Sequence, residues 1–100
     1  MDKAIGNYGF IFMKHKEEIE QFKRQLDGHY SFPAEYPFKF IVPSSSVEEL
    51  KSILPDTDLT ENPSRSGKYT SISFKMKMTS SDEIIHVYLS VNKIKDIISL

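Results

Sequence analysis

Histidines, carboxylates and serines are the residues of this chain whose side chains could catalyse a reaction or hold a metal ion. His15, His29 and His86 lie far apart in the sequence. We single out Asp82 and His86, one turn apart on a predicted helix, and two such groups rarely hold a metal without further ligands. A surface pair at i, i+4 is the interpretation we favour. The sequence therefore predicts no metal site and no cofactor, and the order of the serines indicates no Ser-His-Asp arrangement.

Arginine is the side chain best suited to hold a phosphate, and it occurs only at Arg24 and Arg65. A small hydrolase of the acylphosphatase type needs an arginine in the loop after its first strand and an asparagine nearby. The corresponding loop, residues 43–46, contains neither, and Asn62 alone does not make a site. The serine hydroxyls of that loop precede a predicted helix and could hold an anion, but helix capping is the favoured interpretation. We therefore predict a protein that is not an enzyme.

The composition of the whole chain excludes further classes. Its 100 residues include no cysteine, which excludes disulfides, thiolate metal ligands and cysteine nucleophiles. Thirteen basic against fourteen acidic residues provide no electrostatic attraction for nucleic acid or an anionic membrane. No apolar run approaches the roughly 20 residues needed to span a bilayer, and the N-terminus makes a poor signal peptide. We expect a cytoplasmic protein.

A narrow apolar stripe predicts an amphipathic helix over residues 12–27. The stripe consists of Phe12, Ile19, Phe22 and Leu26. Most of the other positions are charged or amides, so the stripe is expected to dock on the core or on a second copy of the chain. Gly28 is predicted to end the helix. We divide the chain into an N-terminal helical extension, residues 1–28, and a domain, residues 29–100.

Six elements are predicted in the domain, in the order strand, helix, strand, strand, helix, strand. The strands are expected over residues 36–42, 57–62, 68–79 and 94–100, and the helices over residues 47–54 and 80–91. The clearest strand is 68–79, where apolar residues alternate with serine and lysine. Ser46 with Glu49, and Ser80 with Glu83, have the spacing of capping boxes at the two helix starts.

That order of elements is typical of an α+β, ferredoxin-like βαββαβ sandwich, here with an extra N-terminal helix. Such a sandwich packs two helices on one face of an antiparallel sheet of order 4-1-3-2. This order places the two most apolar strands, 36–42 and 68–79, in the centre. It also places the second strand, which is followed by Pro63, at an edge, where a missing N–H is tolerated. The two placements agree with each other.

Three segments resemble the YbeD-like family of small bacterial proteins of unknown function. They are Phe32-Pro33, Tyr-Pro-Phe-Lys-Phe-Ile-Val-Pro at 36–43, and Ser-Gly-Lys-Tyr-Thr-Ser-Ile-Ser-Phe at 66–74. The resemblance extends over residues 32–100. It implies a ferredoxin-like fold similar to ACT regulatory domains, which bind small molecules and pair as dimers. It implies no established activity.

The candidate contacts for a ligand or partner lie on the outward sheet face and in the turn before the third strand. They are Lys39, Gly67, Lys68, Tyr69 and Ser71. Ordinary turn chemistry, in which Gly67 supplies a positive φ and the lysines are solvated, is the competing interpretation. RRM-type RNA-binding modules share this fold and stack bases on that face. Here Tyr69 is the one outward aromatic, which disfavours nucleic acid.

We therefore expect a non-catalytic regulatory or interaction module that binds an unknown protein or small molecule. It is expected to act through its sheet, either across the polar face or by pairing at a strand edge. A homodimer is left open, and no membrane partner is expected. An RRM-like RNA-binding module and an acylphosphatase-like hydrolase are the alternatives from other classes.

Overall fold

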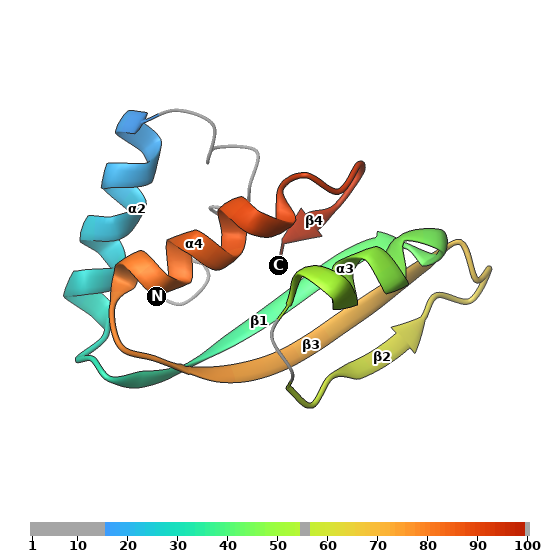
Figure 1. The fold of residues 1–100 in the computed structure, drawn as a ribbon, viewed down its shortest axis with the longest axis horizontal. Helices are drawn as coiled ribbons and strands as arrows, with labels where there is room; N and C mark the ends of the chain where they lie inside the picture. The colour runs from blue at the N-terminus through green and yellow to red at the C-terminus, as the bar shows by residue number, and fades with distance from the viewer. Residues whose placement is uncertain (1–15, 55–56, 100) are drawn as a thin grey trace.

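A four-stranded antiparallel sheet carries helices on one face (Figure 1). The structure is a computed structural model that describes residues 16–54 and 57–99. Its elements are α2 (Lys16–His29), β1 (Ala34–Pro43), the 3-10 turn η2 (Ser44–Ser46), α3 (Val47–Ile53), β2 (Thr60–Pro63), β3 (Tyr69–Met78), α4 (Ser81–Val91) and β4 (Ile98–Ser99). The strand order is β2-β3-β1-β4. The two most apolar strands are therefore central, and the proline-bearing strand lies at an edge, as the sequence predicts.

The two central strands are much longer than their neighbours. β1 and β3 pair along their full length, from Ala34 opposite Met78 to Pro43 opposite Tyr69. Within the described residues, β2 pairs with β3 only from Thr70 to Ser73. In the same described part of the chain, β4 pairs only with Phe40 and Ile41 of β1. The β1–β3 pair therefore runs on alone at one end of the sheet, towards the left of Figure 1.

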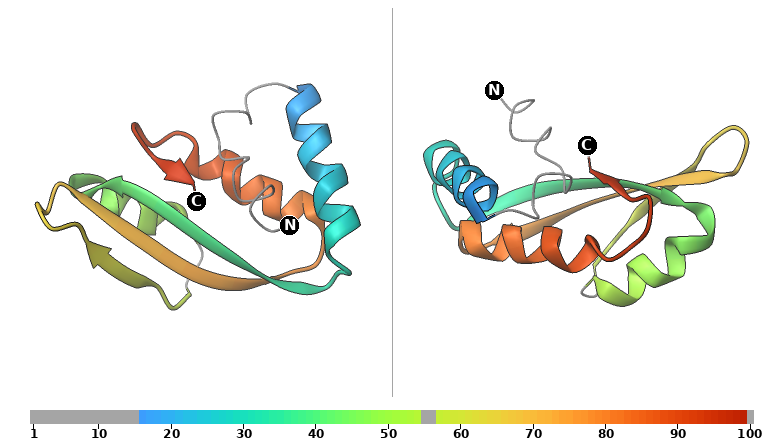
Figure 2. Two further views of the ribbon diagram at one scale, coloured as in Figure 1. Left: turned by 180° about the vertical axis from the view of Figure 1, so that it is seen from behind. Right: turned by 90° about the horizontal axis from the view of Figure 1, so that it is seen from above.

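Alternation along the central strands separates a buried face from an outward one. The buried positions are Tyr36, Phe38, Phe40 and Val42 on β1, and Thr70, Ile72, Phe74 and Met78 on β3. Helices α3 and α4 cover this buried face (Figure 2). Phe38 and Phe74 are direct partners across the ladder, and their rings stack with centroids 5.0 Å apart. The predicted alternation is confirmed on β3, and β1 follows the same period of two.

Helix α2 packs on the core of its own chain, beside α4. Phe22 and Leu26 are buried in the same hydrophobic cluster as the sheet residues, and Ile19 is partly buried against it. The Phe22 ring meets the Tyr88 ring edge-on at 5.5 Å. The predicted stripe residue Phe12 lies outside the described residues. The division of the chain at residue 28 stays a prediction.

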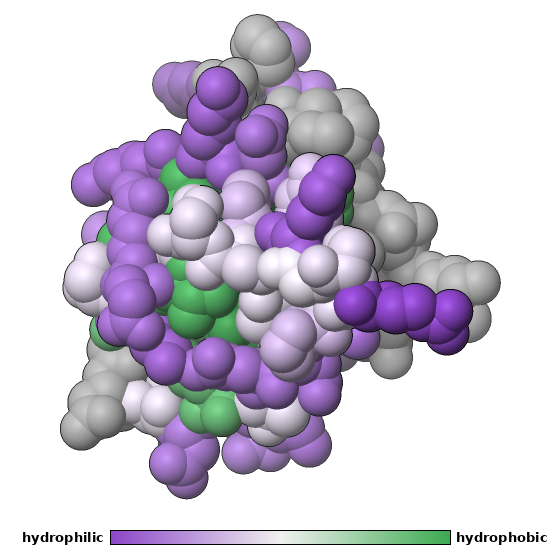
Figure 3. Space-filling model, turned by 90° about the vertical axis from the view of Figure 1, so that its right-hand side faces the viewer, coloured by the Kyte–Doolittle hydropathy of each residue, from purple (hydrophilic) through white to green (hydrophobic). Residues whose placement is uncertain are grey.

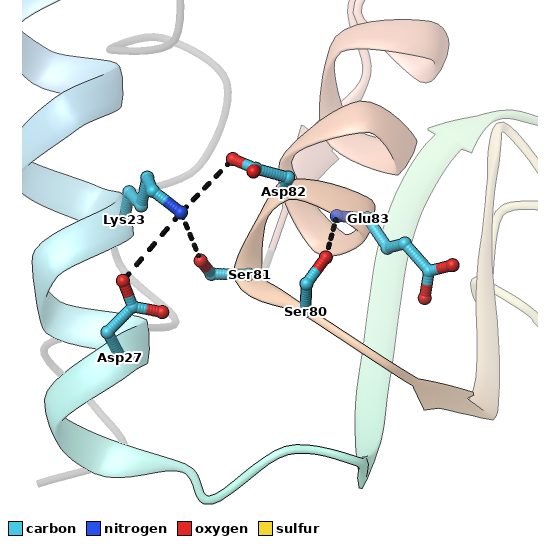
Figure 4. A network of polar contacts seen from close by, with 6 residues as sticks. All are labelled: Lys23, Asp27, Ser80, Ser81, Asp82 and Glu83. Carbon is cyan, nitrogen blue, oxygen red and sulfur yellow. Dashed lines mark hydrogen bonds and ion pairs between the residues drawn. The ribbon is translucent and has the colours of Figure 1, made fainter.

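Lys23 joins α2 to the start of α4 beside these apolar contacts (Figure 4). Its Nζ donates to the Oγ of buried Ser81 at 2.9 Å and lies 3.2 Å from the Asp82 carboxylate. The Asp27 carboxylate, one turn along α2, lies 3.7 Å away. One ammonium group thus satisfies a buried hydroxyl and neutralises the acidic first turn of α4, whose amide dipoles already favour negative charge.

The predicted ends of two elements are wrong. Helix α2 runs through Gly28 to His29, and the Tyr30 N–H donates to the Leu26 carbonyl at 2.9 Å. Gly28 does not adopt a positive φ, and the Tyr30 ring packs on Tyr36 at 5.4 Å, so tertiary packing holds the chain in the helix for longer. Strand β2 covers Thr60–Pro63 rather than 57–62, which places Pro63 itself in the edge strand.

The predicted last strand, 94–100, is also wrong in extent, because only Ile98–Ser99 pairs within the described residues. Ile94 turns into the core, where it is 2% exposed, and its N–H donates to the Val91 carbonyl at 3.0 Å. Asp96 adopts a φ of 64°, which breaks the extended backbone. Leu89 lies on the exposed side of α4.

Of the two predicted capping boxes, the one at α4 forms with its return hydrogen bond shifted by one residue, from Ser80 to Thr79. Ser80 Oγ accepts from the Glu83 N–H at 3.3 Å, and the Glu83 carboxylate accepts from the Thr79 N–H at 2.7 Å. The second hydrogen bond lowers the pKa of Glu83. At the start of α3 the box is wrong: Ser46 makes no side-chain capping hydrogen bond. It ends the η2 turn with φ −101° and ψ 4°, whereas a capping residue needs extended backbone, as Ser80 has.

The substitution Ser80→Ala is expected to lower the free energy of unfolding by about 1 kcal/mol, because it removes the acceptor for one free N–H of α4. Ser46→Ala is the matched control and is expected to change it by less than about 0.5 kcal/mol. Urea unfolding followed by circular dichroism measures both. Equal losses in the two variants would show that the Ser80 hydrogen bond contributes nothing.

Candidate functional site

A groove of ≈ 590 Å³ lies between α3, α4 and the last residues of β3. Its apolar side chains are Ile53, Leu54, Met76, Met78 and Val87. Its polar side chains are Lys77, Asp82, Glu83, His86 and Ser90. An apolar concave surface with a few polar groups at its rim is the usual form of a ligand site.

The acidic groups at the rim of the groove already have partners in the chain. The Asp82 carboxylate lies 3.2 Å from Lys23 Nζ, on the α2 side (Figure 4). The Glu83 carboxylate accepts the Thr79 N–H, and this hydrogen bond lowers its pKa. Each of the two carboxylates therefore already has a partner in the described part of the chain. Across residues 16–54 and 57–99, no three His, Asp or Glu side chains come together as a metal site.

The edge of β3 beside this groove has no strand paired to it in the described part of the chain. β2 reaches only as far as Ser73, so β3 continues alone from Phe74 to Met78 (Figure 1). β3 extends beyond β2 because β2 has only 4 residues, whereas β3 has 10. A strand edge without a partner exposes backbone N–H and C=O groups that can pair with another chain.

The turn before β3 shows which backbone groups point to that edge. The Tyr69 carbonyl accepts from the Ser64 N–H at 2.7 Å, on the β2 side. The Lys68 carbonyl accepts from the Ser44 N–H at 2.9 Å, on the β1 side. Backbone groups of successive strand residues point to opposite sides, so every second residue after Tyr69 faces the β2 side. Thr57 and Asp58 line a hollow with Lys75 but form no ladder with it, so among the described residues the unpaired backbone groups belong to Lys75 and Lys77.

Residues 27–100 match a family model described as "Protein of unknown function (DUF493)". The chain belongs to the DUF493 family. The matched region contains the whole sheet together with α3 and α4, and therefore the groove and the free edge. No curated protein and no solved structure matches the chain. In the described part of this DUF493 protein, no helix is long and apolar enough to cross a membrane.

The candidate contacts predicted from the DUF493 sequence are not gathered at one place. Lys39 points outward on β1 and lines a second hollow, of ≈ 540 Å³, with Asp58 and Lys75. Ser71 lies on β3 opposite Ile41, which is two residues after Lys39 on β1. Gly67 and Lys68 lie in the β2–β3 turn, and Tyr69, which follows them, is 44% exposed.

The turn before β3 is hydrogen-bonded to the serine loop, residues 43–46, which was considered above for anion binding. Gly67 has a φ of 79°, as the turn interpretation predicts. Ser44 Oγ donates to the Gly67 carbonyl at 2.7 Å and lies 2.8 Å from Thr70 Oγ1. The Ser44 hydroxyl is therefore engaged in joining the two loops. This end of the molecule is mostly hydrophilic, with small hydrophobic patches (Figure 3).

The groove was not predicted from the sequence of this DUF493 protein, although one signal was present. The predicted second strand was half as long as the third, so part of the third had to lack a neighbour. Met76 and Met78 share the buried face of β3; Met78 is buried, but Met76 is only partly buried and lines the groove. Bringing Ile53, Leu54 and Val87 together with them requires the packing of both helices.

Proposed function

We propose that this protein is a non-catalytic regulatory or interaction module whose binding site is the groove between α3, α4 and β3. One observation carries the proposal: an apolar groove opens beside a strand edge that no described residue pairs. The acidic rim groups are engaged by Lys23 and by the Thr79 N–H, so the groove offers mainly its apolar side chains to a ligand. Binding without catalysis is the use that these features favour.

We also propose a ferredoxin-like fold and a cytoplasmic location for this protein. Read from β4, the strand order is β4-β1-β3-β2, which supports a ferredoxin-like sandwich of the YbeD-like and ACT-like kind. ACT domains bind small molecules and pair as dimers, which motivates a regulatory role. The absence of cysteine suits a reducing compartment, so we place the protein in the cytoplasm.

The test compares two charged substitutions on tagged protein purified from its native cell. Met76→Glu places a carboxylate in the groove, and Leu89→Glu places one on exposed α4 surface outside it. Proteins and small molecules that co-purify are measured by mass spectrometry. Those bound by the groove are expected to fall about tenfold with Met76→Glu, because a charge would then have to be desolvated.

Unfolding curves of both variants establish that the domain is still folded at the temperature of purification. Molecules retained by wild type and by Leu89→Glu, but lost from Met76→Glu, would support the groove as the site. Equal retention by both variants would place binding elsewhere. Hydrolysis of an acyl phosphate above background by the purified protein would contradict the non-catalytic part of the proposal.

A further inference from the structure

We propose that the groove receives an extended peptide segment of another protein, which adds to β3 as a further strand. The segment carries carboxylates on the residues opposite Lys75 and Lys77 and apolar side chains on the residues between them. This inference rests on the proposed function, since it takes the groove as the binding site. It adds the class of partner and the way in which the partner is held.

The backbone of β3 provides the first argument. The N–H and C=O groups of Lys75 and Lys77 point to the β2 side of β3, beyond Ser73, where the described pairing with β2 ends. An added strand forms two hydrogen bonds with each such residue, so four backbone bonds are available. Strand addition uses bonds of this kind for affinity and uses side-chain pockets for specificity.

The two faces of the sheet then select alternate side chains of the partner. A residue of the added strand opposite Met76 points to the helix-covered face, where Met76, Met78 and Val87 line the groove. Its neighbours point to the outward face, beside the side chains of Lys75 and Lys77. The partner therefore needs apolar residues at every second position.

Charge determines the residues at the remaining positions. Lys75 and Lys77 are exposed, and neither forms an ion pair with any residue that the structure describes. Glu35 lies across the ladder from Lys77, and Asp58 lines the second hollow with Lys75, yet neither acid pairs with its lysine. Opposite charges directly across a strand pair are stabilising, so glutamate or aspartate fits these positions.

The same lysines argue against a second copy of the chain as the occupant. In a two-fold antiparallel pairing of β3 with β3, residues with outward backbone groups must face each other. Lys75 then lies opposite Lys77, or one of these lysines lies opposite itself. Like charges directly opposite are destabilising, so this edge selects an acidic partner over its own copy.

The experiment uses the full chain and synthetic peptides of about eight residues that alternate valine with glutamate or valine with lysine. Binding is measured by NMR titration, and hydrogen exchange reports the Lys75 and Lys77 amides. The glutamate peptide is expected to bind at least about tenfold more tightly than the lysine peptide, with both amides protected. N-methylation of the alternate peptide residues that bond to β3 is expected to abolish binding, and N-methylation of the others is expected to be tolerated.

The charge-reversed double variant Lys75→Glu/Lys77→Glu is expected to prefer the lysine peptide. Lys93→Glu/Lys95→Glu is the matched control at exposed positions and is expected to keep the preference for glutamate. Binding that is equally sensitive to both sets of N-methyl groups would overturn strand addition while leaving the groove as a binding site. No peptide binding, or Lys75 and Lys77 amides protected in a dimer of the protein alone, would overturn the inference.

Discussion

Replacing Phe22 with alanine is expected to lower the free energy of unfolding by about 3–5 kcal/mol. The Phe22 ring is 1% exposed and meets the Tyr88 ring at 5.5 Å, in the cluster that also holds the sheet aromatics. Its removal leaves a cavity that α4 and β1 cannot fill without moving. Because a domain is stable by only about 5–15 kcal/mol, a loss of this size is a large part of the total. Urea unfolding of wild type and variant measures it.

Gln21→Ala is the matched control, since Gln21 is the exposed neighbour of Phe22 on α2. It is expected to change the free energy of unfolding by less than about 0.5 kcal/mol. Deleting residues 1–28 should likewise lower the melting temperature, because Phe22 and Leu26 leave the core with the helix. A Phe22→Ala loss below about 1 kcal/mol would make α2 a passive extension of a domain formed by residues 29–100.

Raising the pH above about 10 is expected to destabilise the protein steeply. The Tyr36 and Tyr88 hydroxyls lie 3.0 Å apart in the core, and burial raises the pKa of each. The charge of Tyr88 raises the pKa of Tyr36 further. The folded state therefore keeps both phenols neutral at a pH where the unfolded chain loses their protons.

The loss of stability at high pH follows from this difference in pKa between the folded and unfolded states. Their contribution to stability is fully present below the unfolded pKa of about 10, and it is lost as the pH rises above that value. Each neutral tyrosine then costs up to about 1.4 kcal/mol of stability per pH unit. Urea unfolding at a series of pH values between about 8 and about 11 measures the slope.

Tyr36→Phe is expected to remove the share of the slope due to Tyr36, and to cost about 1 kcal/mol at neutral pH through the lost hydrogen bond. Tyr69→Phe is the control, because Tyr69 is 44% exposed and lies outside the core. A slope that Tyr36→Phe leaves unchanged would show that other groups govern alkaline unfolding.

Local patterns were enough to predict the elements whose stability depends on neighbours in the sequence. Alternation predicted β1 and β3 and the side of the sheet that each residue faces, since side chains on a strand point to opposite faces in turn. The Ser80–Glu83 box was predicted because both of its hydrogen bonds lie within one turn of chain. Pro63 predicted an edge strand, since it has no N–H for a second ladder.

Where tertiary contacts compete with local preference, the sequence predictions were wrong. Gly28 has a helix-ending preference, yet the packing of Tyr30 on Tyr36 holds the chain in the helix beyond it. Ser46 has a capping sequence, yet the Ser44 N–H and hydroxyl bond to the β2–β3 turn as part of η2. Ile94 has a β-branched side chain suited to a strand, yet it is buried behind the end of α4.

The sequence by itself determined the fold class, the central strand pair and the faces of their side chains, because periodicity and proline act on the backbone directly. Tertiary structure alone decided that α2 docks on its own chain, and that β2 and β4 end where they do. Among the described residues, it thereby left the edge of β3 unpaired at Lys75 and Lys77 and formed the groove beside it. Both features depend on how far one strand overlaps another, and that overlap is set by contacts between residues far apart in the chain.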